Sequence, residues 1–254
     1  MMMSDIPQDL IEEILSRVPA ASLRRLRSTC KLWNDLFKDG RFRENHIRKA
    51  PKQSRILMLN DYKISSLNVN LNVAPPAAVE FKGPLVLKDS HSCSQQVDIE
   101  DIFHCDGLLL CTIRNDRHRL MVWNPYLGET RWIQIFQTTT NSSSDLRYSF
   151  ALGYQNNNFC RSSRILKCWH SIDPMMVFEV YELSSGSWRV FDDIALDCCI
   201  LPKCGVSFKG NAYWLAFGQT VGLLLGFDFT RDTFIRLCLP QAMEFCYLNL
   251  SVVN

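Results

Sequence analysis

Residues 6–42 read IPQDLIEEILSRVPAASLRRLRSTCKLWNDLFKDGRF, and the spacing of their apolar residues decides the fold of this part of the chain. Before Pro19 the apolar residues recur at helical spacing and form one wide stripe, made of Leu10, Ile11, Ile14, Leu15 and Val18. Pro7 suits a first helical turn, because the N–H that proline lacks has no partner there. Pro19 stops the helix. The pattern therefore predicts one amphipathic helix between the two prolines.

A second apolar stripe follows, with spacings of 3, 4, 3 and 4 residues, at Leu23, Leu26, Cys30, Trp33 and Phe37. It predicts a second helix whose other faces carry Arg24, Arg25, Arg27 and Lys31. Asp39 is a candidate cap for a third short helix that carries Phe42, His46 and Ile47. Three helices of this total length bury only about 60% of the surface that they expose when unfolded. We therefore expect part of their apolar surface to be a partner site.

The same residues resemble the F-box motif, whose pattern is roughly Leu-Pro-x-Asp-Leu-x-x-Glu-Ile-Leu-x-Arg-Leu-Pro, then Ser-Leu, Cys-Lys-x-Trp and a Phe. The departures are Ile6 and Val18, where leucine is usual, and Gly40 in place of a common proline. The resemblance implies that the helices dock on the Skp-type adaptor of a Skp–cullin–F-box ubiquitin ligase. By motif position the implied contact residues are Pro7, Leu10, Ile14, Leu15, Val18, Pro19, Leu23 and Leu26, with Cys30 and Trp33 bracing the second helix.

Beyond Ala50 the pattern changes to short apolar runs bounded by Gly, Asn, Asp and Pro, which is typical of an all-β region. Residues 55–67, RILMLNDYKISSL, predict a hairpin that turns at Asn60 and Asp61. Residues 68–96 are expected to be loop, with one strand at 85–87. The apolar run from Trp214 contains polar residues and three glycines, so we expect two strands and a turn there and not a membrane span.

A loose repeat runs through the β-rich region. A first hairpin recurs in IFHCDGLLLC (102–111), in SFALGYQ with RILKCWH (149–170) and in VSFKGNAYWLAF (206–217). A second hairpin follows each one, and its last strand carries Trp132, Trp188 or Phe234, at spacings of 56 and 46 residues. Each unit of about four short strands has the size of a propeller blade, and radially stacked blades bury one another's faces.

This region resembles the F-box-associated β-propeller domain of the large plant families, through CDGLLLC, VWNPYLGETRWI, YELSSGSWRVF and FDFTRDTFIRLCLP. The predicted fold class is α+β and multi-domain. A three-helix F-box at residues 1–48 precedes an all-β, propeller-like domain of roughly three to four blades at 49–254. The last residues, CYLNLSVVN, resemble the first strand of a further blade, whereas closed propellers have 4 to 8 blades. The domain is therefore expected to be shortened at its C-terminus.

The cysteine content and the spacing of possible metal ligands indicate which classes of function to expect. The eleven cysteines are an odd number, and residues 1–10 contain no basic region followed by an apolar stretch. We therefore expect a protein that is not secreted, with reduced thiols, in the cytoplasm or nucleus. The sequence lacks paired Cys or His residues at ligand spacing, and no metal or cofactor is expected. His104-Cys105-Asp106 has the residue types of a nucleophilic site. Neighbours on a strand point to opposite faces, however, so we expect no catalytic residue here.

The leading hypothesis is a non-catalytic substrate receptor of a cullin-type ubiquitin ligase. Its helices bind the Skp adaptor, and through it a cullin scaffold, while the β-domain holds a target protein that the sequence does not identify. The alternative is a β-propeller interaction scaffold with no ubiquitin ligase role, whose helices only cap the propeller. The basic helix face also allows a DNA-binding helix-turn-helix. That alternative is disfavoured because base-reading Asn, Gln or Ser residues are not interleaved with the arginines, so neither nucleic acid nor membrane is an expected partner.

Overall fold

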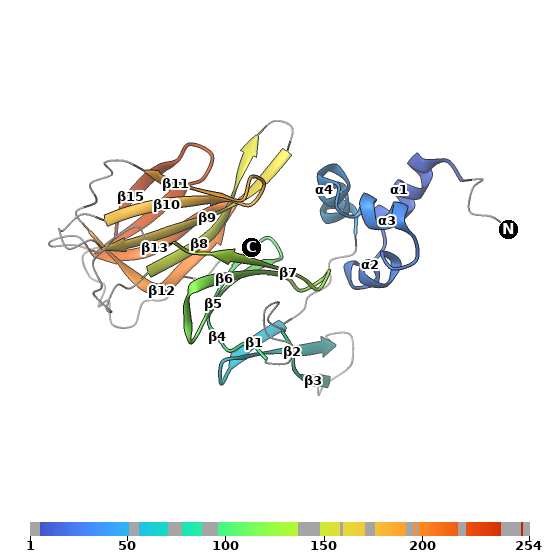
Figure 1. Cartoon of the computed structure of the whole chain (residues 1–254), viewed down its shortest axis with the longest axis horizontal. Helices are drawn as coiled ribbons and strands as arrows, with labels where there is room; N and C mark the ends of the chain where they lie inside the picture. Colours follow the sequence, from blue (N-terminus) through green and yellow to red (C-terminus); the bar gives the residue numbers. More distant parts are fainter. Residues whose placement is uncertain are drawn as a thin grey trace. The chain divides into compact units, whose positions relative to one another are not determined.

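The structure is a computed structural model in which helices precede strands (Figure 1). It describes residues 6–50, 56–70, 78–87, 96–136, 148–157, 160–170, 176–191, 196, 198–217, 222–239 and 250. The chain divides into two compact units. The first contains residues 1–100 and 112–133, and the second contains residues 101–111 and 134–254. The α+β fold class predicted from the sequence is confirmed.

Four helices form the N-terminal part of the first unit, one more than predicted: α1 (Gln8–Ser16), α2 (Ala20–Leu26), α3 (Lys31–Leu36) and α4 (Gly40–Lys49). The predicted second helix is divided in two because hydroxyl groups compete for its carbonyls. Ser28 Oγ donates to the Arg25 carbonyl at 2.7 Å, and Thr29 Oγ1 donates to the Leu26 carbonyl at 2.6 Å. Cys30 then adopts an extended conformation, with φ −153° and ψ 154°, before α3 begins.

The helices enclose a small apolar core built from Leu15, Leu23, Phe37 and Phe42. The rings of Phe37 and Phe42 lie 5.3 Å apart. Asp39 caps α4 as predicted, since its carboxylate accepts hydrogen bonds from the backbone N–H groups of Arg41 and Phe42 at 2.8 and 3.0 Å. Buried His46 ties α4 to the end of α1, because its Nε2 donates to the Val18 carbonyl at 2.8 Å.

The first sheet has three strands in the order β1 (Ile56–Asn60), β2 (Lys63–Asn70) and β3 (Ala78–Pro84). The predicted hairpin turn was one residue early. Asp61 and Tyr62 occupy the turn with φ of 48° and 61°, so a tyrosine takes a left-handed position that propensity disfavours. The predicted strand at residues 85–87 was also wrong, because β3 ends at Pro84 and pairs with β2 instead.

Three four-stranded antiparallel sheets follow, which confirms the predicted blade-sized repeat. Within each sheet the strands lie side by side in chain order. They are β4 (Ile99–Cys105), β5 (Leu108–Ile113), β6 (Asp116–Asn124), β7 (Glu129–Gln134), β8 (Tyr148–Asn157), β9 (Cys160–His170), β10 (Met176–Glu182), β11 (Ser187–Phe191), β12 (Cys199–Phe208), β13 (Asn211–Phe217), β14 (Gly222–Asp228) and β15 (Thr233–Cys238). The predicted final strand at residues 246–254 lies outside the described residues except for residue 250.

The turns repeat more strictly than the aromatic residues do. The β4–β5 and β12–β13 hairpins both use two residues with positive φ, Asp106-Gly107 and Lys209-Gly210. The second hairpins place a positive φ at Gly128, Gly186 and Asp232. Trp188 and Phe234 each follow that position by two residues, but Trp132 follows it by four. Trp132 therefore points to the same strand face one strand period later.

In the second unit the β8–β11 and β12–β15 sheets bury aromatic rings against each other. The ring of Phe178 on β10 lies 4.6 Å from that of Phe234 on β15, which in turn lies 4.9 Å from Phe227. Gly153 allows the close approach of the two sheets. A Cβ at this position would lie 2.3 Å from the Phe229 ring and 2.4 Å from the Gly210 carbonyl oxygen.

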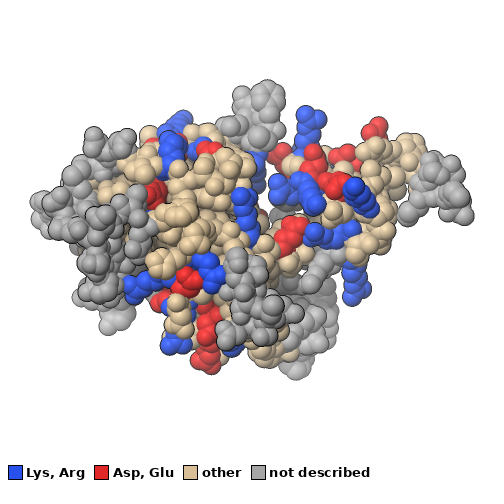
Figure 2. Space-filling model, in the orientation of Figure 1, with Lys and Arg blue, Asp and Glu red and all other residues tan. Residues whose placement is uncertain are grey.

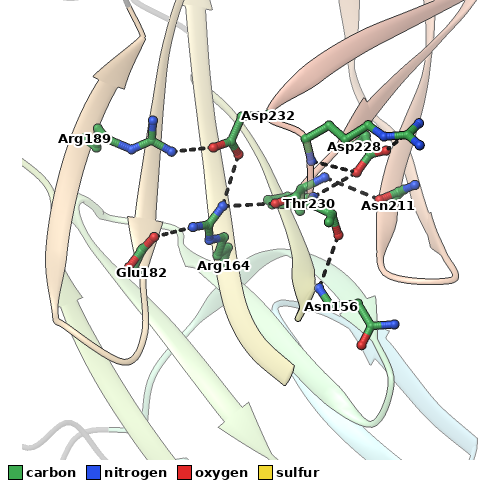
Figure 3. Close-up of polar contacts among 10 residues, drawn as sticks. Asn156, Arg164, Glu182, Arg189, Asn211, Asp228, Thr230 and Asp232 are labelled. Atoms are coloured by element: carbon green, nitrogen blue, oxygen red, sulfur yellow. Dashed lines mark hydrogen bonds and ion pairs between the residues drawn. The ribbon is translucent and has the colours of Figure 1, made fainter. Parts of the chain in front are cut away.

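A buried arginine joins the same two sheets (Figure 3). Arg164 on β9 donates to the Phe229 carbonyl at 3.0 Å and forms ion pairs with Glu182 and Asp232. Arg189 on β11 contacts the other oxygen of Asp232. The guanidinium therefore satisfies a backbone carbonyl and two carboxylates at once, as its several donors allow.

A second buried cation lies within the β8–β11 sheet. Lys167 and its cross-strand neighbour Glu179 are 1% and 6% exposed, and their charged atoms are 2.9 Å apart. The ammonium also lies 4.4 Å from the ring centre of Trp169 and 4.9 Å from that of Tyr148. Rings around a desolvated ammonium offer their negative faces to it, so the sheet stabilises this charge from several sides.

Candidate partner-binding surface on the helices

The helix α1 is apolar on two sides, and only one of them faces the core of its own unit. Ile11, Leu15 and Val18 pack against that core. Leu10 and Ile14, one helical turn apart, are 52% and 51% exposed. We call these two residues the α1 apolar face. Leu32, near the start of α3, is a further large apolar side chain that is 52% exposed.

Ion pairs on the polar side of α1 hold this helix against α4. The carboxylate of Glu13 accepts hydrogen bonds from Lys49 on α4 and from Arg17, whose Nη2 lies 2.7 Å away. These two cations, Lys49 first, lower the pKa of the Glu13 carboxyl. Figure 2 shows basic and acidic side chains intermixed over the helices. Lys49 thus connects α4 to α1 through Glu13, while Leu10 and Ile14 stay exposed.

The ten residues implied by the F-box resemblance fall into two groups. Leu15 and Leu23 are buried in the helical core, and Val18, Leu26 and Trp33 pack against it. The others keep contact with solvent to different degrees, namely Pro7, Leu10, Ile14, Pro19 and Cys30. The periodicity of the stripe located the helix but could not separate these groups. The structure also adds exposed Leu32, which the sequence analysis did not select.

The structure places the residues of the His104-Cys105-Asp106 tripeptide in different environments, with Cys105 buried and Asp106 in a turn. Burial raises the pKa of the Cys105 thiol to about 11, so the thiolate is scarce at neutral pH. His104 Nε2 accepts a hydrogen bond from the Gly107 backbone N–H at 3.1 Å, and partial desolvation lowers the pKa of this exposed imidazole. Asp106 lies in the turn and forms an ion pair with Arg161 at 2.9 Å. His104 and Asp106 therefore have structural contacts that account for them, and Cys105 is a buried thiol.

In the described part of the chain, three or more His, Cys, Asp or Glu side chains do not gather anywhere to form a metal site. The helices of this part are also too short and too polar for any of them to cross a membrane.

Comparison with protein families agrees with both halves of the structure. Residues 3–45 match the model of the F-box domain. Residues 55–254 match the model of the F-box associated beta propeller domain, which covers most of the chain. The chain belongs to the family of F-box proteins with an F-box associated beta propeller domain. It joins the α1 apolar face of an F-box to four sheets of an F-box-associated domain.

Curated relatives from Arabidopsis thaliana are also named as F-box proteins. The chain is 52% identical over 260 residues to a putative F-box/kelch-repeat protein, covering 100% of this chain and 67% of that protein. It is 52% identical to the putative F-box only protein 9, covering 99% of this chain and 66% of the relative. A third relative, an F-box protein, is 52% identical over 266 residues, with coverages of 100% and 75%. The chain thus spans about two thirds to three quarters of the length of these relatives.

Proposed function

We propose that the chain is a substrate receptor of a Skp–cullin–F-box ubiquitin ligase and that its α1 apolar face binds the Skp-type adaptor. The observation that carries this proposal is the half-exposed pair Leu10 and Ile14 on an F-box helix. The division that we propose places the F-box at residues 1–48 and the F-box-associated domain at 49–254. Large apolar side chains at the surface of a rigid helix lower the free energy of a complex when a partner covers them.

The proposed mechanism is proximity. The helices attach the chain to the adaptor and thereby to a cullin, while the sheets hold a target protein near a ubiquitin-charged conjugating enzyme. Such a receptor raises the effective concentration of the target's lysines and supplies no catalytic group of its own. Function in the cytoplasm, the nucleus or both is part of this proposal. The target is a protein recognised by loops of the β-domain, because loops on a shared scaffold determine specificity.

The test replaces Leu10 and Ile14 by aspartate in the full chain and measures binding to a purified Skp-type adaptor. Because both side chains are half exposed, the helices should stay folded. Two carboxylates placed in an apolar interface should weaken binding about a hundredfold or more. The matched control is Leu237→Asp on β15, since Leu237 is also 52% exposed but lies on a sheet. Unchanged binding of the double variant would contradict the proposal.

The scaffold alternative makes the opposite prediction. If the helices only capped the β-domain, Leu10, Ile14 and Leu26 should be protected in the isolated chain. Leu26 packs against the helical core, whereas Leu10 and Ile14 are exposed, and their exposure supports the adaptor hypothesis. An isolated, soluble chain that fails to bind the adaptor at micromolar concentration would restore the scaffold alternative.

A further inference from the structure

The junction between α2 and α3 presents two hydroxyl groups that the adaptor proposal does not use. Ser28 and Thr29 are both exposed and lie between the end of α2 at Leu26 and the start of α3 at Lys31. Each donates its hydroxyl proton to a carbonyl three residues earlier, Ser28 to Arg25 at 2.7 Å and Thr29 to Leu26 at 2.6 Å. An accessible hydroxyl in such a junction can be reached by an enzyme that modifies it.

The residues around Ser28 give it a distinct chemical context. Arg25 lies three residues before it and Arg27 one residue before it, in the run RRLRST. Exposed Leu32 lies four residues after it. Guanidinium groups at fixed offsets from a hydroxyl pair with carboxylates in the peptide groove of a protein kinase. Because α2 has seven residues and helices this short are marginal, the segment can leave its helix to enter such a groove.

We propose that Ser28 is a phosphorylation site and that phosphorylation weakens binding of the helices to the Skp-type adaptor. The effect on adaptor binding rests on the proposed function, whereas the phosphorylation site does not. In the reaction, Ser28 Oγ attacks the γ-phosphorus of ATP, and the bond from that phosphorus to the bridging oxygen breaks. ADP leaves, and the kinase's catalytic base takes the hydroxyl proton.

The expected consequence follows from the contact that Ser28 makes. Its Oγ loses the proton that it donates to the Arg25 carbonyl, and a phosphate of about −1.5 to −2 charge takes its place. The dianionic phosphate that prevails at neutral pH only accepts hydrogen bonds, so its oxygens repel the carbonyl and the negative end of the α2 dipole. The junction must therefore rearrange. Leu26 before it is a predicted adaptor contact, and Cys30 and Trp33 after it are predicted to brace the second helix, so the positions of these residues relative to one another change.

The first experiment tests the site itself. The full chain is incubated with ATP and a recombinant serine/threonine kinase that selects arginine three residues before its acceptor, and the product is mapped by mass spectrometry. Phosphate should be found on Ser28 and should be lost in Ser28→Ala and Arg25→Gln but kept in Thr29→Ala. Ser185 is exposed and has no arginine three residues before it, so it serves as the internal negative control. Modification of Thr29 or Ser185 in place of Ser28 would overturn the assignment.

The second experiment tests the effect on binding and does not depend on the kinase. Phosphoserine is incorporated genetically at position 28 or, as the matched control, at position 185 of the full chain. Phosphoserine at 28 should raise the Kd for the purified adaptor about tenfold or more, and phosphoserine at 185 should leave it unchanged. Equal or tighter binding of the position 28 form would overturn the regulatory half. If the unmodified chain does not bind, the proposed function fails, while the kinase experiment still decides the site.

Discussion

The helices and the sheets of the second unit bury apolar surface in different ways. The helical core has four buried apolar residues, Leu15, Leu23, Phe37 and Phe42, and α1 keeps one apolar face in solvent. The β8–β11 and β12–β15 sheets place aromatic rings and buried ion pairs against each other. Small units bury a smaller fraction of their surface. The sheets therefore stabilise one another within the chain, whereas the helices keep an exposed apolar face, which we propose is covered by another chain.

The largest expected effect on stability comes from removing one aromatic ring of the helical core, and it should be confined to the helices. Phe42 is 1% exposed, and Phe42→Ala should cost about 3–5 kcal/mol in the free energy of unfolding of the helices. Amide hydrogen exchange should accelerate in α1 to α4 and stay slow in β8 to β15. The matched control is Phe136→Ala, because Phe136 is 70% exposed and has little packing to lose. Loss of protection in the sheets as well would mean that the regions fold as one cooperative unit.

The next effect is confined to the sheets. Glu179→Leu removes the carboxylate opposite buried Lys167 and should cost about 3 kcal/mol, measured by urea unfolding. The double variant Lys167→Met, Glu179→Leu should regain most of that stability, because it removes both charges from the interior. A double variant that is no more stable than the single one would show that the ion pair itself stabilises the sheet.

Alkaline pH should also destabilise the sheets more than the helices. Burial raises the pKa of Cys105 to about 11 and those of Cys111 and Cys168 to about 12, from an ordinary value of 9.0. The folded state therefore holds these protons more tightly. Their stabilisation is complete below pH 9, and each thiol lowers stability by roughly 1.4 kcal/mol per pH unit from pH 9 until its folded pKa is reached.

Thermal unfolding between pH 8 and 11 measures this slope. In Cys111→Ala the dependence of stability on pH should be weaker than in the wild type, because one proton fewer is held more tightly by the folded state. Equal pH dependence of Cys111→Ala and the wild type would mean that Cys111 keeps a normal thiol pKa in the folded chain.

Local sequence rules predicted the features of the fold that depend on local chemistry. The Asp39 cap and the predicted hairpins at residues 102–111 and 206–217 follow from residues within a few positions of one another. The strand β3 was missed because its pairing with β2 crosses a connection whose residues carry no strand pattern. The helix break at Ser28 was missed because the apolar periodicity continues through it, while side-chain hydroxyls end the helix.

For the candidate surface, the sequence predicted the apolar helix but not which of its residues are exposed. A wide stripe on α1 indicates an apolar helix, but its period does not say which edge meets the core. Packing against the other helices selects Ile11 and Leu15 for the interior and leaves Leu10 and Ile14 outside. That choice depends on residues in α2 to α4 that are distant in sequence.

A smaller effect is expected at the start of α4. Asp39→Ala removes the acceptor for two backbone N–H groups and should cost about 1 kcal/mol in the stability of the helices. Asp39→Asn keeps an acceptor oxygen there and should cost less than the alanine variant. Helical circular dichroism during urea unfolding gives both values, and equal losses would mean that the cap contributes through its charge.

The smallest effect on stability should occur where the proposed effect on binding is largest. Leu10→Ser and Ile14→Ser replace half-exposed side chains, so the free energy of unfolding should change by no more than about 0.5 kcal/mol. A core residue of the same stripe, Leu15→Ser, should lose several times more because its side chain is buried. Urea unfolding of the isolated chain compares the three variants. A large loss for Leu10→Ser would mean that α1 uses this face inside the chain, and the difference between the helices and the sheets would then disappear.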